Sequence, residues 1–250
     1  MSNYHLFQEL TRTEAKHLGP EAVLLFPVGA TEQHGPHLPV GTDHFAVEQI
    51  ARAAGQVAAQ QVPVVVAPTL PFGSSHHHIP FGGTMSLSTE TYYRLVFELC
   101  ETLIQGEWRR IFILNGHGGN HEVVQLVARD LALKYPVQMA AASYWNIAWD
   151  KFIEAGANIG ARLPGHAGFF ETSVVIALRP ELIREPRPQR RTVTTIKQEQ
   201  TFGHTISERP HHADADGVSD PPGPEPVAVT HQTRPGRPAP AAAHRRSACR

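Results

Sequence analysis

Residues 21–43 read EAVLLFPVGATEQHGPHLPVGTD, an apolar run that passes directly into a polar loop. The apolar part, Glu21 to Val28, is short and ends in Pro-Val, a pattern that predicts a buried strand leading into a loop. Beyond the loop, residues 44–60 place apolar side chains at helical spacing, and Thr42 or Asp43 is positioned to cap that helix. We therefore predict a strand, a polar loop and a helix in succession.

The same succession recurs along the chain. Further apolar strands are predicted at 62–67, 110–114 and 137–143, and further helices at 89–105, at 121–134 and from 171 onward. This alternation predicts an α/β fold: a mostly parallel sheet with helices on both faces, in a three-layer α/β/α sandwich. Ligands in such folds bind in the crevice at the carboxyl ends of the strands, so the polar loops that follow the strands are expected to converge there.

Composition sets the class of protein. With 250 residues, 41% of them hydrophobic, we expect one domain over residues 1–200 and a Pro/Ala/Arg-rich tail over 201–250 that is disordered or atypical. The formal net charge of -1 gives no reason to expect nucleic acid or a membrane surface as a partner. Two cysteines, Cys100 and Cys249, offer neither a disulfide framework nor a thiolate zinc site, and no signal peptide is recognisable. A cytoplasmic location is the resulting prediction.

Histidine is unusually frequent, with 16 residues, and the first candidate site lies in the loop quoted above. Glu32 and His34 are two positions apart in an extended segment, so their side chains can point the same way, and Asp43 stands where it can turn back toward them. Carboxylates and an imidazole suit Zn²⁺, Mn²⁺ or Fe²⁺, and one carboxylate can bridge two cations. The alternative stays open: Glu32 caps a turn, His34 is a loop residue and Asp43 only caps the helix.

The second candidate is Asn115-Gly-His-Gly-Gly-Asn120, which follows a predicted strand and precedes a predicted helix. Its glycines permit a tight turn with the backbone close to a ligand, so His117 is expected to project into the crevice with Gly118 beside the substrate. A phosphate-binding loop is disfavoured, because neither a G-x-G-x-x-G spacing nor a Gly-Lys-Ser/Thr ending is present.

The third segment is residues 165–173, GHAGFFETS. Glu171 begins an apolar helix and is a candidate metal ligand or catalytic acid. His166 precedes it in a glycine-bounded loop, where it can exchange protons with a substrate or simply hydrogen-bond to backbone.

The fourth segment is residues 74–87, SSHHHIPFGGTMSL. Its three adjacent histidines cannot all face one site. We favour His78 as the substrate-binding residue, with Gly83 and Thr84 shaping the pocket wall, and assign no role to His76 and His77.

Together, these four segments resemble the signature blocks of the creatininase (creatinine amidohydrolase) family, in order, over about residues 18–180. The resemblance implies an α/β enzyme, typically a hexamer, that uses two divalent metal ions to hydrolyse a C–N amide bond. The expected partners are a small-molecule amide or short peptide as substrate and further copies of the chain in a homo-oligomer.

Carried over by motif position, the resemblance implies that Glu32, Asp43 and His117 hold one metal, and that His34 and a bridging Asp43 hold the other. The chain departs from the creatinine-hydrolysing branch at Gly119, where that branch has a metal-binding Glu, and we expect Glu171 to replace it. The NGHGGN form also occurs in formamide hydrolases and in a peptidase of redox-cofactor maturation, so creatinine is one candidate substrate among several.

The mechanism that follows is attack by a metal-activated hydroxide on the amide carbonyl, with His166 protonating the departing nitrogen. Two alternatives remain from the sequence. One is a non-catalytic metal-binding or assembly protein derived from a truncated family member, since residues 205–250 show no sign of the closing helix usual in the family. The other is a nucleotide-binding α/β domain that uses the glycine-rich loop.

Overall fold

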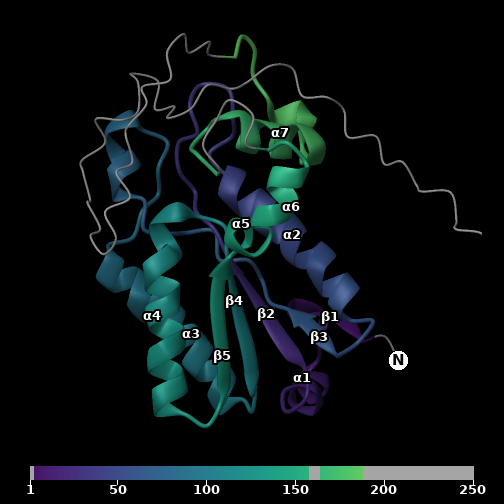
Figure 1. Cartoon of the computed structure of the whole chain (residues 1–250). Coiled ribbons are helices and arrows are strands. Elements are labelled where there is room, and N and C mark those ends of the chain that lie inside the picture. The colour runs from purple at the N-terminus through teal and green to yellow at the C-terminus, as the bar shows by residue number, and fades with distance from the viewer. Residues whose placement is uncertain (1–2, 158–163, 188–250) are drawn as a thin grey trace, which may run out of the picture.

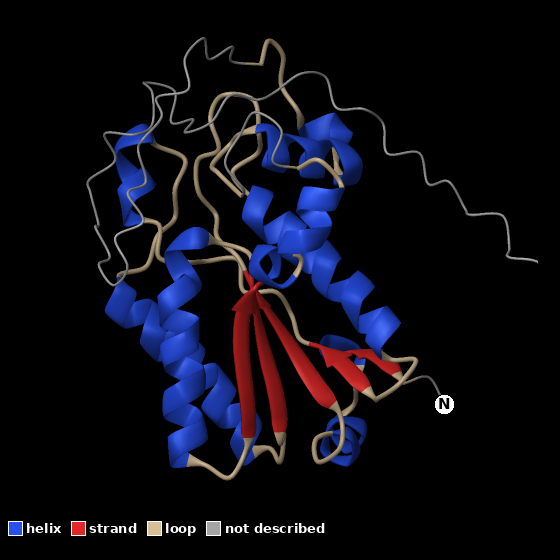
Figure 2. Cartoon of the chain, viewed as in Figure 1, coloured by secondary structure: helices blue, strands red, loops and turns tan. Residues whose placement is uncertain are grey.

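The computed structural model describes residues 3–157 and 164–187, and within them five strands form one parallel sheet (Figures 1 and 2). The strands are β1 (Tyr4–Leu6), β2 (Val23–Val28), β3 (Val64–Val66), β4 (Arg110–Asn115) and β5 (Gln138–Ser143). Their order across the sheet is β1-β3-β2-β4-β5, and every neighbouring pair is parallel. The longest pairings join β2 to β4 and β4 to β5. Strands β2 and β4 lie inside the described sheet, and β1 and β5 form its edges.

Helices cover both faces of this sheet. They are α1 (Arg12–Leu18), α2 (Thr42–Ala58), α3 (Thr89–Gln105), α4 (His121–Lys134), α5 (Tyr144–Ile147), α6 (Trp149–Glu154) and α7 (Phe169–Leu178). Figure 1 shows α3 and α4 on one side of the sheet and α2, with α5 to α7 above it, on the other. The predicted three-layer α/β/α sandwich is confirmed.

Alternation along β2 explains how the two layers are held. Leu24 is fully buried in the hydrophobic cluster that includes Tyr92 and Val96 of α3. Its neighbour Leu25 points to the opposite face and packs in the cluster that includes Val47 of α2. Because successive side chains of a strand face opposite sides, a strand buried on both faces is apolar throughout, as the sequence of β2 is.

Two elements at the amino terminus, β1 and α1, are not predicted from the sequence. Strand β1 has only three residues and lies at the edge of the sheet, so it carries too little periodicity to be recognised. Helix α1 does carry a start signal: Thr11 and Glu14 form a capping box, in which each side chain binds the other's backbone N–H. The predicted tail at 201–250 lies outside the described residues.

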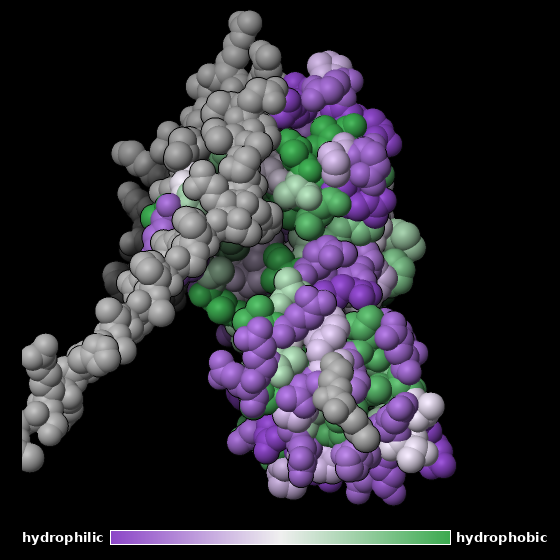
Figure 3. Space-filling view, turned by 90° about the vertical axis from the view of Figure 1, so that its right-hand side faces the viewer, coloured by the Kyte–Doolittle hydropathy of each residue, from purple (hydrophilic) through white to green (hydrophobic). Residues whose placement is uncertain are grey.

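The surface near β1 and α2 mixes residue types. Figure 3 shows this side with hydrophilic residues over much of the described surface and hydrophobic residues in smaller groups between them. Val57 of α2 is one of the exposed apolar side chains. Within the described residues, no helix combines the length and the hydropathy needed to cross a bilayer.

Candidate active site and metal centre

All four segments singled out in the sequence contribute side chains to one site above the carboxyl ends of the strands. The loop after β2 carries Glu32 and His34 and leads to Asp43 in the first turn of α2. The loop after β4 carries His117, and Glu171 lies in the first turn of α7. Figure 2 shows loops and helix ends crowding above the strand tips, where parallel α/β sheets bind ligands.

A cavity of about 160 Å³ opens at this point. It is lined by residues from the loops after the strands and from the segment before α7. They are Glu32, Asp43, His77, His78, Gly116, His117, Gly118, Gly119, Trp145, Pro164, Gly165, His166 and Glu171. The five predicted metal ligands are all buried, including His34 behind this wall, with exposures of at most 8%.

These five side chains form two ligand groups that share one residue. Glu32, Asp43 and His117 present ligand atoms within 4.8 Å of one another, and so do His34, Asp43 and Glu171. In the first group, His117 Nδ1 lies 2.9 Å from Asp43 Oδ2 and 3.3 Å from Glu32 Oε1. In the second, His34 Nε2 lies 3.3 Å from Asp43 Oδ1 and 3.5 Å from Glu171 Oε2. Each oxygen of Asp43 therefore faces a different imidazole, which is the arrangement of a bridging carboxylate.

The outward nitrogens of the two imidazoles show that this set suits a metal. His34 Nδ1 donates to the backbone carbonyl of Glu32 at 3.0 Å, and His117 Nε2 lies 3.2 Å from the carbonyl of Ser74. A carbonyl only accepts, so each ring carries a proton on its outer nitrogen and directs the other nitrogen at the carboxylates. Anchoring of this kind is typical of metal-binding histidines.

Unsatisfied atoms inside the cluster point the same way. Among the described residues, Glu32 Oε2, His34 Nε2 and Asp43 Oδ2 are buried without a well-formed hydrogen bond. Buried polar atoms are seldom left so, because the loss of hydration costs about 1–3 kcal/mol each. Carboxylate oxygens and imidazole nitrogens fit Zn²⁺, Mn²⁺ or Fe²⁺, so the residues present fit the divalent ions that the sequence predicts.

The electrostatics of the cluster also favour added positive charge. Burial alone lowers the pKa of His117, but the carboxylates of Glu32 and Asp43 raise it well above its ordinary value. Burial also lowers the pKa of His34, but the carboxylates of Glu171 and Asp43 outweigh this effect and raise it well above its ordinary value. Burial raises the pKa of Glu171. Without cations, the protein thus holds protons where its carboxylates crowd together.

The structure also gives a reason for Gly119. A Cβ at this position would lie 2.2 Å from the backbone oxygen of Ser74 and 2.6 Å from His117 Nε2, so no other side chain fits without a shift of the loop. The carboxylate of Glu171 instead reaches the cluster from α7, and the backbone N–H of Ala167 donates to it. The predicted substitution of one carboxylate by the other therefore has a geometric basis.

Two asparagines that the sequence interpretation did not assign hold the NGHGGN loop. The Asn115 side chain accepts from the backbone N–H of His117 and donates to its carbonyl, at 3.0 and 2.7 Å. Asn120 accepts from the N–H of Ser74 and donates to the carbonyl of Gly29, each at 3.0 Å. Their positions at the two ends of the motif are the only signal in the sequence.

Two more unassigned residues tie the first loop to the rest of the site. His37 is fully buried, and its Nε2 hydrogen-bonds to Thr172 Oγ1 at 3.0 Å, which joins the loop after β2 to α7 beside Glu171. Burial lowers the pKa of His37 to about 4, so this imidazole is neutral near pH 7. Gln33 hydrogen-bonds to two histidines.

The predicted substrate-binding residues and the predicted catalytic residue His166 divide into two groups. His78, His166 and Gly118 line the cavity, and Glu32 Oε1 lies 3.4 Å from His78 Nε2 and 3.6 Å from His166 Nδ1. Gly83 and Thr84 are not among the lining residues. Gly83 is exposed, and the Thr84 hydroxyl accepts from the backbone N–H of Gln33 at 3.1 Å, so Thr84 supports the wall from behind.

The two remaining histidines of the fourth segment also separate. His76 hydrogen-bonds through Nδ1 to Ser86 Oγ at 2.8 Å and is exposed. His77 lines the cavity, and its ring lies against that of His78 at a tilt of 46°, with centroids 4.1 Å apart. Position within the triplet therefore decides which ring reaches the site.

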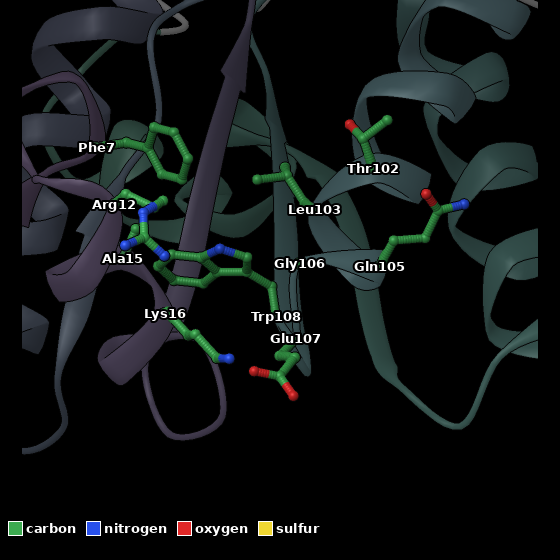
Figure 4. A pocket seen from close by; sticks show the side chains of 10 residues that line it. All are labelled: Phe7, Arg12, Ala15, Lys16, Thr102, Leu103, Gln105, Gly106, Glu107 and Trp108. Carbon is green, nitrogen blue, oxygen red and sulfur yellow. The ribbon is translucent and has the colours of Figure 1, made fainter.

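A larger hollow, of about 630 Å³, lies at the opposite end of the sheet (Figure 4). Phe7 and Trp108 pack there with ring centroids 5.7 Å apart, and Arg12 and Lys16 extend from α1 beside them. Its described lining includes one carboxylate, Glu107, and no histidine. Among the described residues, the candidate metal-binding and catalytic side chains therefore lie at the smaller cavity.

Several known proteins are similar to this chain in sequence and in fold. The model of the family described as creatininase, creatinine amidohydrolase, matches residues 8–238. A mycofactocin precursor peptide peptidase of Mycobacterium ulcerans (strain Agy99) is 33% identical over 169 residues, which cover 66% of this chain and 61% of that protein. The chain thus spans about three fifths of the length of that curated relative.

Two further matches carry the creatininase name. A creatinine amidohydrolase of Pseudomonas putida is 29% identical over 191 residues, which cover 68% of this chain and 69% of the relative. The solved structure titled "E122Q mutant creatininase, Zn-Zn type" superposes with a TM-score of 0.67 at 26% identity, covering 89% of this chain and 88% of that one.

Proposed function

Because the chain belongs to the creatininase family, we propose that it is a metal-dependent amidohydrolase that cleaves a C–N amide bond. The observation that carries this proposal is the pair of buried ligand groups that share Asp43. A buried cluster of carboxylates and imidazoles opposes folding unless something binds it, and two divalent cations are the charge that its shape and ligand types suit.

In this proposal, Glu32, Asp43 and His117 hold one cation, and His34, Asp43 and Glu171 hold the other. Two cations so held would lower the pKa of a bound water and provide hydroxide near neutral pH. The named matches support Zn²⁺ as one of the metals, since a similar structure is titled as a Zn–Zn form. Mn²⁺ and Fe²⁺ suit the same ligand types.

The remaining side chains of the cavity act on the substrate. His166 and His78 place ring nitrogens beside Glu32, where the reacting amide would enter. We assign His166 to the departing nitrogen and His78 to substrate binding, with the Gly118 backbone along the same wall. Burial, together with neighbouring His34 and His78, holds the pKa of His166 well below its usual value, so this ring is uncharged before the reaction.

The substrate class is a small amide, a formamide or a short peptide. A cavity of about 160 Å³ admits a small group or the end of a peptide. Identity to the peptide peptidase is 33%, against 29% to the creatinine amidohydrolase, and Gly119 departs from the creatinine-hydrolysing pattern. These observations favour a peptide or formyl amide over creatinine. Assembly into a homo-oligomer remains part of the proposal and is measurable by light scattering.

The test is a metal-dependent screen. The full chain is stripped with a chelator, reloaded with Zn²⁺, Mn²⁺ or Fe²⁺, and assayed for amine release from creatinine, N-formyl amines and short peptides. We expect hydrolysis of one class that disappears on chelation and returns with metal. If the protein bound two equivalents of metal but cleaved none of the three classes, a non-catalytic metal-binding protein would be the better description.

A further inference from the structure

Gln33 stands between the ligands Glu32 and His34, and its side-chain amide is fixed in one orientation. The backbone N–H of Gly35 donates to Gln33 Oε1 at 2.9 Å, and since a backbone N–H cannot accept, this atom is the amide oxygen. The amide nitrogen therefore points the other way. It lies 2.8 Å from His78 Nδ1 and 3.1 Å from His166 Nε2.

An amide nitrogen only donates hydrogen bonds, and it carries two hydrogens. Both ring nitrogens that face it must therefore accept, which places the proton of neutral His78 on Nε2 and that of neutral His166 on Nδ1. These two protonated nitrogens are the ones near Glu32 Oε1. The rings lie face to face, with centroids 4.1 Å apart and planes 23° apart, so a single amide reaches both.

His34 and His117 are held in the opposite sense. Backbone carbonyls of Glu32 and Ser74 accept from their outer nitrogens, so these rings direct an unprotonated nitrogen at the carboxylates when a metal is bound. When the partner of the outer nitrogen accepts a hydrogen bond, the inner nitrogen is unprotonated and can bind a metal. When that partner donates, the inner nitrogen carries the proton and is an N–H donor. The four histidines near Glu32 and Asp43 therefore differ in role according to the group that binds the outer nitrogen of each ring.

We propose that Gln33 is a positioning residue that fixes His78 as the Nε2–H form and His166 as the Nδ1–H form. Both are thereby kept out of the metal groups and face the cavity as neutral hydrogen-bond donors. The inference rests on the proposed function and deepens it. It assigns the cavity wall two N–H donors. His78 can recognise the carbonyl oxygen of an amide, as a neutral histidine does in other enzymes, and the Nδ1–H of His166 is directed at the departing nitrogen.

The burial of this arrangement supports its specificity. Gln33 is 6% exposed and His78 is 7% exposed, so water does not easily substitute for the amide. Because each ring accepts from the amide at one nitrogen, neither ring carries a second proton while this hydrogen bond is formed. Neutral rings are what a shared amide donor requires.

The test reads proton positions directly, by long-range ¹H–¹⁵N spectra of the Zn²⁺-loaded full chain labelled at histidine. Signals are assigned by their loss in His78→Gln and His166→Gln. In the unmodified protein we expect one Nε2–H ring, His78, and one Nδ1–H ring, His166. The opposite form at either ring would overturn the proposal without any variant of Gln33.

Substitutions then ask whether Gln33 is the cause. In Gln33→Glu, a carboxylate that only accepts should reverse both rings, and in Gln33→Met each ring should become a mixture of forms. The matched control is Gln125→Met, because Gln125 Nε2 lies 2.8 Å from His121 Nε2 on the exposed side of α4. We expect this control to leave both signals unchanged.

These outcomes are independent of turnover. If no amide is cleaved but the two ring forms are as stated and reverse in Gln33→Glu, the proposed function fails and the role of Gln33 stands. If an amide is cleaved and both rings keep their form in all Gln33 variants, the enzyme stands and the role of Gln33 is wrong.

Discussion

Two regions of this molecule are equally buried and chemically opposite. Beneath α3 and α4, the interior is built from side chains such as Leu24, Val96 and Ile113, all fully buried. At the carboxyl edge of the same sheet, Glu32 and His34 are also buried, with 1% and 0% exposure. Burial of the first set drives folding, whereas burial of the second set opposes it unless charge and hydrogen bonds are satisfied.

Stability and function are therefore expected to depend on different side chains of one fold. A side chain of the apolar region contributes to the free energy of unfolding and touches no substrate. In the proposed function, a side chain of the polar region contributes to metal binding and catalysis, and we expect its replacement to cost the fold little. Substitutions chosen from each region should therefore produce opposite patterns of effect.

The largest effect is expected at Asp43, which belongs to both ligand groups. Asp43→Asn keeps the size of the side chain but removes the charge, so bound metal should fall from two equivalents to one or none. Amide hydrolysis should fall by about 10³-fold or more. The free energy of unfolding of the metal-free protein should change by no more than about 1 kcal/mol, because His34 and His117 can release protons rather than remain unpaired.

The control for this variant is Asp150→Asn. Asp150, like Asp43, lies in the first turn of a helix, but it is exposed and outside the cavity. Metal content, measured by elemental analysis, and turnover should both match the unmodified protein. Full metal content and full turnover in Asp43→Asn would remove the central premise of the site.

The second effect is expected at Leu24, in the apolar region. Leu24→Ala should lower the free energy of unfolding by about 2–5 kcal/mol, because it removes packing contacts and leaves a cavity. Metal content and turnover per folded molecule should be retained, since Leu24 packs against α3 and does not line the cavity. Denaturant titration of the metal-loaded protein measures the first quantity.

Leu133→Ala provides the matched control, because Leu133 of α4 is 80% exposed. Its unfolding free energy should stay within about 0.5 kcal/mol of the unmodified protein. The separation of the two regions would fail if Leu24→Ala lost metal at a denaturant concentration where the protein remains folded.

The same contrast explains how far the sequence could predict the molecule. The apolar runs at β2 and β4 and the helical patterns of α2, α3 and α4 are local and periodic, so their predicted bounds agree closely with the structure. Edge strand β1 is not predicted, because it depends on pairing with β3, which is distant in the sequence.

At the site, ligand types in short motifs were enough to identify which side chains gather. The roles of Gln33 and Asn120 depend on distances between loops, such as the 2.8 Å from Gln33 to His78, and no spacing within one loop encodes them. Asn115 instead acts within its own loop, on the backbone of His117. The same reason explains Gly83 and Thr84, which lie near His78 in sequence yet outside the cavity lining. Residue type predicts what a side chain can bind, and tertiary packing decides what it faces.

The smallest expected effect concerns Cys100, whose thiol can ionise although it lies in the apolar region. Burial raises the pKa of its thiol from 9.0 to about 12. The unfolded chain therefore loses this proton at lower pH than the folded protein, so the thiol's contribution to stability is complete below about pH 9 and declines from there toward pH 12. Tyr92, fully buried in the same cluster, also has a pKa raised well above normal, by burial first and by Cys100 second.

Comparison of Cys249→Ser with Cys249→Ser/Cys100→Ala isolates that contribution. The difference between their free energies of unfolding should be constant up to about pH 9 and should shrink above it, while the common Tyr92 term largely cancels. Metal content at pH 8 should be equal in the two proteins, because Cys100 lies among apolar side chains on the face opposite α2. A difference that stayed constant to pH 11 would mean that solvent reaches the thiol, and the apolar region would then be less tightly closed than the polar cluster at the edge of the same sheet.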